Sequence, residues 1–147
     1  MPILFYSHTK GPYVAFSNFS PHSFELDGAV WPTVEHYFQA AKFPGTEHAE
    51  AIRLARTPTL AKRLGRSRAV TLRPDWEEVK EEVMRRAVHQ KFASHPDLRQ
   101  LLLETGDEDL IEDAPRDYYW GRGARGTGKN RLGVILMDVR SALRENG

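Results

Sequence analysis

The sequence lacks several features that would define whole classes of protein. It contains no cysteine among its 147 residues, which excludes disulfides, thiolate metal sites and a cysteine nucleophile. Its net charge is only +1, so no chain-wide field attracts nucleic acid or a membrane surface, and any anion site has to be local. No apolar run has transmembrane length, and the start, Met1 to Tyr6, is too short and lacks the basic residues of a secretory signal. We therefore expect one cytoplasmic domain, residues 1–147, with no membrane partner.

Metal-ligand spacing is also missing. The six histidines form no HExxH or comparable pattern, so we expect no metal and no cofactor. The pair Glu112-Asp113 resembles the two carboxylates of a glycosidase, but adjacent side chains in a strand point to opposite faces. That pair is therefore a weak candidate for the chemistry.

Apolar periodicity and end signals predict an α+β domain that is mainly helical, with a few short antiparallel strands. Strands are expected at 3–6, 23–26, 29–31 and 110–111, with an Asp27-Gly28 hairpin turn between the second and third. Helices are expected at 96–103 and 132–143, and after four capping residues: Thr33, Thr46, Thr57 and Asp75. The first of these four should end at Pro44-Gly45 and the third at Gly65.

A glycine-rich loop from Asp117 to Asn130 crowds aromatic residues, cations and four glycines into fourteen residues. From Gly123 it reads Gly-x4-Gly-Lys, but Asn130 stands where a phosphate loop needs a Ser or Thr hydroxyl for magnesium. The loop also follows aromatic residues rather than a buried strand, which argues against a nucleoside triphosphatase. What remains is an aromatic platform beside backbone N–H donors, which suits a planar ring that carries a phosphorylated sugar.

The first predicted helix carries Glu35, Gln39 and Lys42 on one face. Glu35 and Lys42 are almost eclipsed, roughly 10 Å apart along the helix axis. Spacing alone favours a solvated face, with the carboxylate near the helix start and the lysine near its end. The neighbouring aromatic side chains favour burial instead, and a buried stripe would supply a proton-handling carboxylate and a nucleophilic lysine.

Two further groups have both a binding and a structural interpretation. Guanidinium groups could hold a phosphate, although such clusters are more often solvated surface: Arg63, Arg66, Arg68 and Arg73. Asn18, between two phenylalanines, could place an amide in a pocket, although an asparagine that satisfies a turn is more common.

Taken in order, several segments closely resemble the NADAR superfamily, and within it the YbiA-like bacterial branch. The resemblance spans most of the chain and is specific because many side-chain positions recur in the same order. The segments that carry it are Phe16-Ser17-Asn18-Phe19, Trp31-Pro32-Thr33-x-Glu35-His36-Tyr37-Phe38-Gln39-Ala40-x-Lys42-Phe43, Leu64-Gly65-Arg66, Trp76, Met84, Lys91-Phe92, Asp117-x-x-Trp120-Gly121-x-Gly123 and Gly126-x-Gly128-x-Asn130-x-Leu132-Gly133.

The resemblance implies an N-glycosidase. YbiA-like members look like enzymes that hydrolyse early riboflavin-pathway intermediates, the aminopyrimidine ribosylamine phosphates, and release ribose 5-phosphate. Other branches remove ADP-ribose from guanine in nucleic acid, so nucleic acid is a partner only in that alternative. The near-neutral charge favours the small metabolite. A non-catalytic module that binds ADP-ribose or NAD is the other alternative, but it would not need Glu35 and Lys42.

The same resemblance suggests roles for single residues. Glu35, Lys42 and Asp117 are expected to be catalytic, with Glu35 handling protons and Lys42 forming a Schiff base at ribose C1. In a second version Glu35 activates water and Lys42 only positions the substrate. Trp120 is expected to stack on the base, while Arg66 and loop N–H groups hold the phosphate. The expected substrate-binding residues are Asn18, Phe19, Arg66, Trp76, Trp120, Gly121, Gly128 and Asn130.

Overall fold

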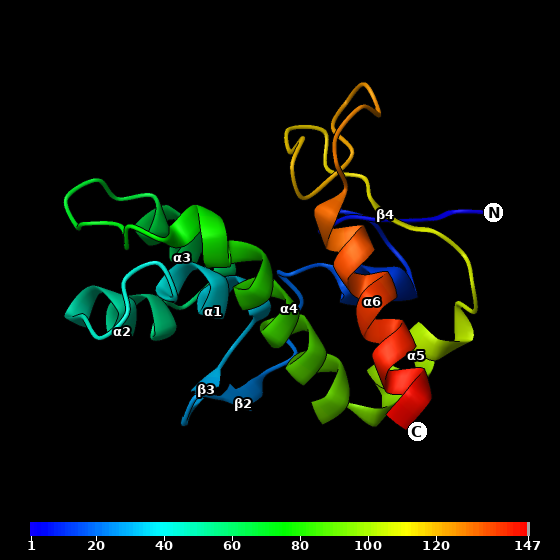
Figure 1. Ribbon diagram of the computed structural model, residues 1–147, viewed down its shortest axis with the longest axis horizontal. Helices are drawn as coiled ribbons and strands as arrows, with labels where there is room; N and C mark the ends of the chain where they lie inside the picture. Colours follow the sequence, from blue (N-terminus) through cyan, green and yellow to red (C-terminus); the bar gives the residue numbers. More distant parts are fainter. Residues whose placement is uncertain (147) are drawn as a thin grey trace. The chain divides into compact units, whose positions relative to one another are not determined.

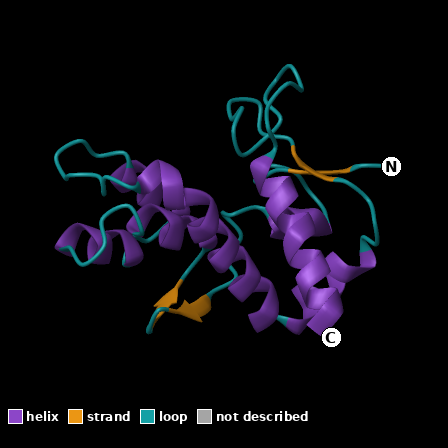
Figure 2. Ribbon diagram, viewed as in Figure 1, coloured by secondary structure: helices purple, strands orange, loops and turns teal. Residues whose placement is uncertain are grey.

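A computed structural model describes residues 1–146. The chain forms two compact units, one made of Met1–Ser20 with the chain from Phe92 onward, the other of Pro21–Lys91. Each unit combines helices with a two-stranded sheet (Figure 2), so the α+β class is as predicted. The single domain over 1–147 stays a prediction. Among the described residues, no helix is both long and apolar enough to cross a membrane.

The Pro21–Lys91 unit contains a hairpin and four helical segments. The hairpin pairs β2 (Phe24–Leu26) with β3 (Ala29–Trp31) in antiparallel fashion, as predicted. Its turn residues Asp27 and Gly28 have φ of 54° and 78°, the left-handed conformation that two-residue hairpin turns of type I′ require. The helices are α1 (Val34–Ala40), α2 (Glu47–Arg53), α3 (Pro58–Gly65) and α4 (Trp76–Ser94), which belongs to this unit as far as Lys91 (Figure 1).

Threonine caps begin the first three helices of this unit. The side chains of Thr33, Thr46 and Thr57 each accept a hydrogen bond from the backbone N–H three residues later, as the sequence predicts. Helix α1 ends at Ala40, earlier than expected, and the chain then turns. α1 packs against both α2 and α3 around a small apolar core: Ala40, Phe43, Ile52 and Ala61.

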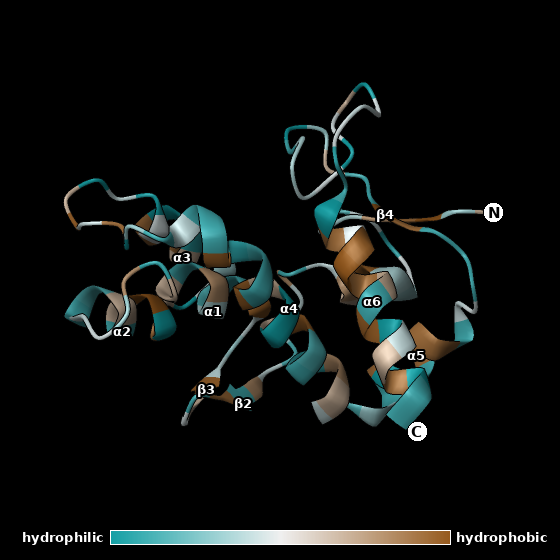
Figure 3. Cartoon of the chain, in the orientation of Figure 1, coloured by the Kyte–Doolittle hydropathy of each residue, from teal (hydrophilic) through white to brown (hydrophobic). Residues whose placement is uncertain are grey.

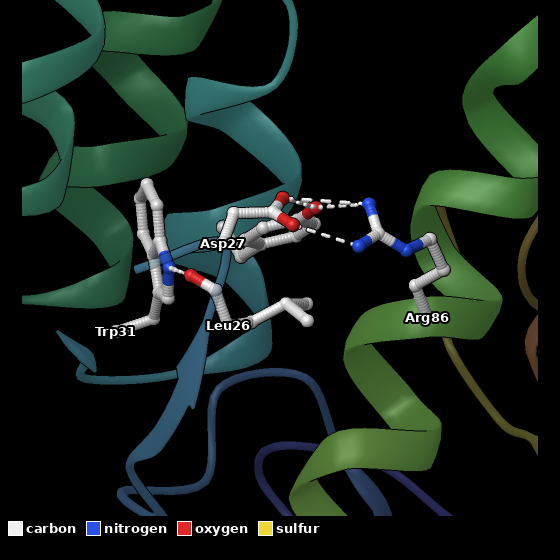
Figure 4. Close-up of polar contacts among 5 residues, drawn as sticks. Leu26, Asp27, Trp31 and Arg86 are labelled. Carbon is white, nitrogen blue, oxygen red and sulfur yellow. Dashed lines mark hydrogen bonds and ion pairs between the residues drawn. The ribbon is translucent and has the colours of Figure 1, made fainter. Parts of the chain in front are cut away.

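A polar network ties the hairpin to α1 and α4 (Figure 4). The Tyr37 hydroxyl donates to Asp27 Oδ2 at 2.6 Å, and Arg86 Nη2 donates to Asp27 Oδ1 at 2.7 Å. The bond from Arg86 is the main reason that the pKa of Asp27 is lowered, while burial raises the pKa of Tyr37, so the phenol keeps its proton as a donor. The network fixes α1, the helix that carries Glu35, against its neighbours.

The other unit is built on β1 (Ile3–Phe5), a 3₁₀ helix η1 (Pro12–Phe16), α5 (Pro96–Glu104), β4 (Leu110–Glu112) and α6 (Arg131–Asn146). β1 and β4 pair in parallel, which differs from the antiparallel expectation. A long connection rather than a tight turn joins these strands, so no hairpin imposes an antiparallel pairing. α6 packs on β4 and α5, and Figure 3 shows its hydrophobic residues in brown. The predicted apolar positions of α6 are buried: Leu132, Ile135, Leu136, Val139 and Leu143.

Candidate active site

Helix α1 places two polar side chains in the interior of the Pro21–Lys91 unit. All seven of its residues are buried, because α2, α3 and β3 surround it. Glu35 is 7% exposed and Gln39 is 5% exposed, so the interpretation as a solvated face is wrong for both. Gln39 Nε2 donates to Glu35 Oε2 at 2.6 Å, one helical turn away. Burial of an ionised carboxylate is unfavourable unless hydrogen bonds or opposite charges compensate for the lost hydration.

The surroundings of Glu35 oppose its charged form. Burial raises the pKa of Glu35, and this effect outweighs the hydrogen bond from Gln39 and the positive charges of Lys62, Lys42 and Arg66, which all lower it. Glu35 therefore keeps its proton to higher pH than an exposed glutamate does. A carboxylic acid whose pKa is raised in this way is better suited to act as a general acid.

Lys42 lies in the turn that follows α1, one position beyond the helix cap Ala41. Its Nζ donates to the carbonyl oxygen of Gly65 at 3.3 Å and lies 6.0 Å and 5.9 Å from the ring centroids of Phe38 and Trp76. Burial lowers the pKa of Lys42, Glu35 opposes that shift, and the charge of Arg66 adds to it. A larger neutral fraction makes the amine more nucleophilic at physiological pH.

Gly65, the last residue of α3, contacts both Lys42 and Gln39. The sequence predicts it as a helix stop, and α3 does end there, but Gly65 does not adopt the left-handed conformation. It is needed for space instead, because a Cβ at this position would lie 2.0 Å from Gln39 Oε1. Sequence reasoning missed this role, since the pattern of the chain does not reveal which distant side chain packs against a glycine.

A pocket of about 380 Å³ opens beside Lys42 and the end of α3. Such a volume lies near the lower end of the range for small-molecule sites, roughly 300–1,000 Å³. Three residues predicted from the sequence, Lys42, Arg66 and Trp76, line it together with Gly65, Ser67 and Arg68. Trp76 is buried and packs edge-to-face on Phe38, with ring centroids 5.0 Å apart.

The predicted arginine cluster divides into different environments. The side chains of Arg66 and Arg68 are exposed at the pocket and make no hydrogen bond or ion pair within residues 1–146. Arg73 instead forms an ion pair with Asp75 at 2.7 Å and donates to the carbonyl of Ala41, which makes it structural. Two guanidinium groups are thus available at the pocket for an anionic ligand.

The other predicted residues lie in the second unit, where Asp117 organises the glycine-rich loop. Its Oδ1 accepts hydrogen bonds from the backbone N–H groups of Tyr119 at 3.0 Å and Trp120 at 2.8 Å. Trp120 is half-buried and packs edge-to-face on Tyr119, with ring centroids 4.8 Å apart. Asp117 therefore has a structural role in the loop, while its catalytic role and the stacking by Trp120 stay predictions.

Asn130 closes the same loop. It has a φ of 50°, and its amide bridges β4, with Oδ1 accepting from the N–H of Glu112 and Nδ2 donating to the carbonyl of Leu110, both at 2.9 Å. Asparagine tolerates this left-handed conformation better than most residues. The amide thus makes one hydrogen bond at each end within the fold, and its predicted role in substrate binding stays a prediction.

The glycines of the loop allow the chain to cross itself closely. A Cβ on Gly128 would lie 2.4 Å from the carbonyl oxygen of Gly121, and a Cβ on Gly121 would approach three atoms at 3.0 Å. The backbone N–H groups of Gly123, Gly126 and Gly128 all donate to carbonyls within the unit. These three amides are occupied, contrary to the expectation that loop N–H groups hold phosphate.

Asn18 and Phe19 follow η1 in the same unit. Asn18 is buried, at 9% exposure, and the N–H of Phe19 donates to Ser17 Oγ at 3.1 Å. The Ser17 hydroxyl, not the Asn18 amide, accepts this bond, so it does not decide between the two interpretations of Asn18. The binding roles of both residues stay predictions.

Sequence and structure comparisons relate this chain to known proteins. The NADAR domain family matches residues 4–144. N-glycosidase YbiA of Escherichia coli is 50% identical over 141 residues, which cover 96% of this chain and 88% of that protein. N-glycosidase Npun_R5314 of Nostoc punctiforme is 49% identical over 147 residues, which cover 98% and 94%.

One longer relative and one solved structure complete the comparison. The chloroplastic riboflavin biosynthesis protein PYRR of Zea mays is 42% identical over 156 residues, covering 96% of this chain and 25% of that protein. The NMR structure of E. coli YbiA has a TM-score of 0.89 at 44% identity, covering 99% of this chain and 88% of that one.

Proposed function

Because this chain belongs to the NADAR family and is an N-glycosidase, a hydrolase of N-glycosyl bonds, we propose that it cleaves the aminopyrimidine ribosylamine phosphates of early riboflavin synthesis. The products are the free aminopyrimidine and ribose 5-phosphate. The similarity of the maize protein named for riboflavin biosynthesis supports this choice of substrate.

The observation that carries the proposal is the grouping of Lys42, Arg66 and Arg68 at one pocket. A phosphorylated sugar needs a cationic site for its phosphate and a reactive group near C1. The two guanidinium groups match the geometry of phosphate oxygens, and burial lowers the pKa of Lys42, which makes its amine a nucleophile. Trp76 and Gly65 shape the wall between them.

The reaction begins when the neutral amine of Lys42 attacks C1 and the C1–N bond to the pyrimidine breaks. Glu35, which retains its proton because burial raises its pKa, gives that proton to the departing nitrogen. Glu35 then takes a proton from the lysine nitrogen and passes it to the ring oxygen, so that the C1–O bond breaks and the sugar ring opens to a protonated Schiff base. Water adds to C1, the C1–Nζ bond breaks, and ribose 5-phosphate leaves with Lys42 restored.

A direct attack by water is the competing mechanism. There Glu35 in its ionised form activates the water, and Lys42 only positions a hydroxyl or the phosphate. Borohydride reduces a Schiff base to a stable amine, so it separates the two. We expect substrate plus borohydride to add the mass of the reduced sugar phosphate to the wild-type protein and not to Lys42→Ala. A wild-type protein that releases base but gains no mass would establish the water mechanism.

The choice of substrate is tested with a panel. The purified protein is incubated with the amino and oxo forms of the pyrimidine ribosylamine phosphate and with ADP-ribosylated guanosine, and the free base is followed by chromatography. We expect release from a pyrimidine compound and dependence of that release on its 5-phosphate. Release of guanosine from the ADP-ribosylated compound, with no release from the pyrimidine compounds, would favour the ADP-ribosyl activity. Binding of ADP-ribose without release from any compound would favour a binding module.

A further inference from the structure

We propose that Gln39 is a positioning residue that controls when Glu35 gains its proton, and that Gly65 provides the space its amide needs. The inference deepens the proposed function, since it gives a role to a neighbour of the proposed acid. Its physical basis is a set of contacts inside the Pro21–Lys91 unit that exist in the free protein.

Gln39 is the hydrogen-bond partner of the Glu35 side chain within residues 1–146. Its Nε2 donates to Glu35 Oε2 at 2.6 Å, and both side chains are buried. A donor that points at a carboxylate favours the ionised form over the protonated form. Removing this donor should therefore make Glu35 take up its proton at higher pH.

The other end of the same amide has an unusual environment. Gln39 Oε1 is the one buried side-chain oxygen or nitrogen without a hydrogen-bond partner in the described part of the chain. An unpaired buried acceptor is unfavourable, so a compensating interaction has to hold the amide in this orientation. The short bond to Glu35 is that interaction.

Gly65 confines the amide. The position that a Cβ of residue 65 would take lies 2.0 Å from Gln39 Oε1 and 2.7 Å from its Cδ. The unpaired oxygen thus fills the space that glycine leaves at the end of α3. Gly65 also lines the pocket and accepts the hydrogen bond from Lys42, so the amide contacts both the acid and a residue that lines the pocket.

The proton on Glu35 and the orientation of this amide should be linked. An ionised Glu35 needs a donor, which Nε2 supplies, and Oε1 is then left unpaired. A protonated Glu35 carries an O–H donor, and half a turn of the amide would bring Oε1 round to accept it. Gln39 can thus serve either form of the acid during a reaction in which Glu35 gives up and regains a proton.

Charged groups around Glu35 act over longer distances. Lys42 follows α1, while α3 and its cap contribute Lys62 and Arg66, and all three favour the carboxylate. On α2, His48 forms a hydrogen bond with the carbonyl oxygen of Leu64 and Arg53 pairs with Glu50. β3 carries no ionisable side chain. These charges stay in place when Gln39 is replaced, so the change measured belongs to the amide.

The test is a carbon-13 NMR titration of the Glu35 carboxyl in the free protein, with the signal assigned by its loss in Glu35→Gln. Gln39→Met keeps the length of the side chain and removes the donor. We expect the midpoint of the Glu35 titration to rise by roughly one to two pH units, the value of a hydrogen bond to a charged group. Gln100→Met is the matched control, because Gln100 donates to Glu104 at 3.2 Å with the same spacing on an exposed surface.

Two outcomes would overturn the proposal. One is a midpoint of the Glu35 titration that is the same in Gln39→Met as in Gln100→Met. The other is a set of Gln39 side-chain amide signals that do not shift over the pH range in which Glu35 titrates. This second outcome is measured on the wild-type protein, so it decides the question even if Gln39→Met does not fold. The alkaline limb of base release, where Glu35 loses the proton that it donates, should shift with the NMR midpoint in Gln39→Met, which lost packing alone would not cause. If the wild-type protein releases no base, the proposed substrate is wrong, while the titration still judges Gln39.

Discussion

Replacing Gly65 by alanine perturbs the packing that holds Glu35, Gln39 and the pocket wall together. The new Cβ would lie 2.0 Å from Gln39 Oε1, 2.7 Å from Cδ and 2.8 Å from Cβ of the same side chain. All three distances are shorter than van der Waals contact, so either the Gln39 side chain or the end of α3 has to move. Movement of Gln39 would break its 2.6 Å bond to Glu35.

The size of the effect follows from these two changes. Overpacking a core costs about 1–3 kcal/mol, and losing a hydrogen bond to a charged group costs about 1.5–3 kcal/mol. Alanine in place of glycine within a helix returns roughly 0.5–1 kcal/mol. We therefore expect Gly65→Ala to lower the free energy of unfolding by roughly 2–5 kcal/mol, which corresponds to a fall in Tm of about 2–4 °C for each kcal/mol.

The assay is urea unfolding followed by circular dichroism for a double-mutant cycle. Gln39→Ala removes two of the three atoms that the new Cβ would meet, so Gly65→Ala should cost about 1–2 kcal/mol less in that background than alone. Gly45→Ala is the comparison for backbone strain alone, since Gly45 has a φ of 74° and open space around it. Costs of Gly65→Ala and Gln39→Ala that simply add within about 0.5 kcal/mol would refute the packing argument.

Four other substitutions address the acid, the anion site and the loop. Because burial raises the pKa of Glu35 above its ordinary 4.5, stability should fall as the pH rises through and above that value, and Glu35→Gln should flatten this fall in urea unfolding at several pH values. Arg66→Ala and Arg68→Ala should each raise KM for the phosphorylated substrate about 10- to 100-fold, as lost charge-assisted hydrogen bonds would, while an equal effect on the dephosphorylated compound would contradict a phosphate site. Asn130→Ala should cost roughly 2–4 kcal/mol in thermal unfolding, because two buried backbone groups lose their partners, and an unchanged Tm would contradict the bridging role.

Local features of the fold were accessible from the sequence. Thr33 marks the start of α1 because a cap interacts with residues three positions away, and Asp27-Gly28 marks the hairpin because the turn needs left-handed conformations. Gly65 was correctly predicted as the end of α3. Each of these signals depends on residues that are neighbours in the chain.

Features that depend on distant contacts were harder to predict. Spacing alone favoured a solvated face for Glu35 and Gln39, whereas the neighbouring aromatic side chains favoured burial. That α2 and α3 are the helices that cover α1 depends on contacts between segments far apart in the chain. The parallel pairing of β1 with β4 was missed for the same reason. The bonds from the Asn130 amide to β4 were not predicted either, since only the folded chain brings those residues beside it; its binding role stays a prediction.

The proposed mechanism requires Lys42 for the release of ribose 5-phosphate from an aminopyrimidine ribosylamine phosphate. Its most direct test measures free pyrimidine and ribose 5-phosphate together, for the wild-type protein and Lys42→Ala under the same conditions. We predict equal amounts of the two products from the wild-type protein and almost none from Lys42→Ala. An intact substrate after incubation with the wild-type protein, or equal rates for the two proteins, would contradict the account.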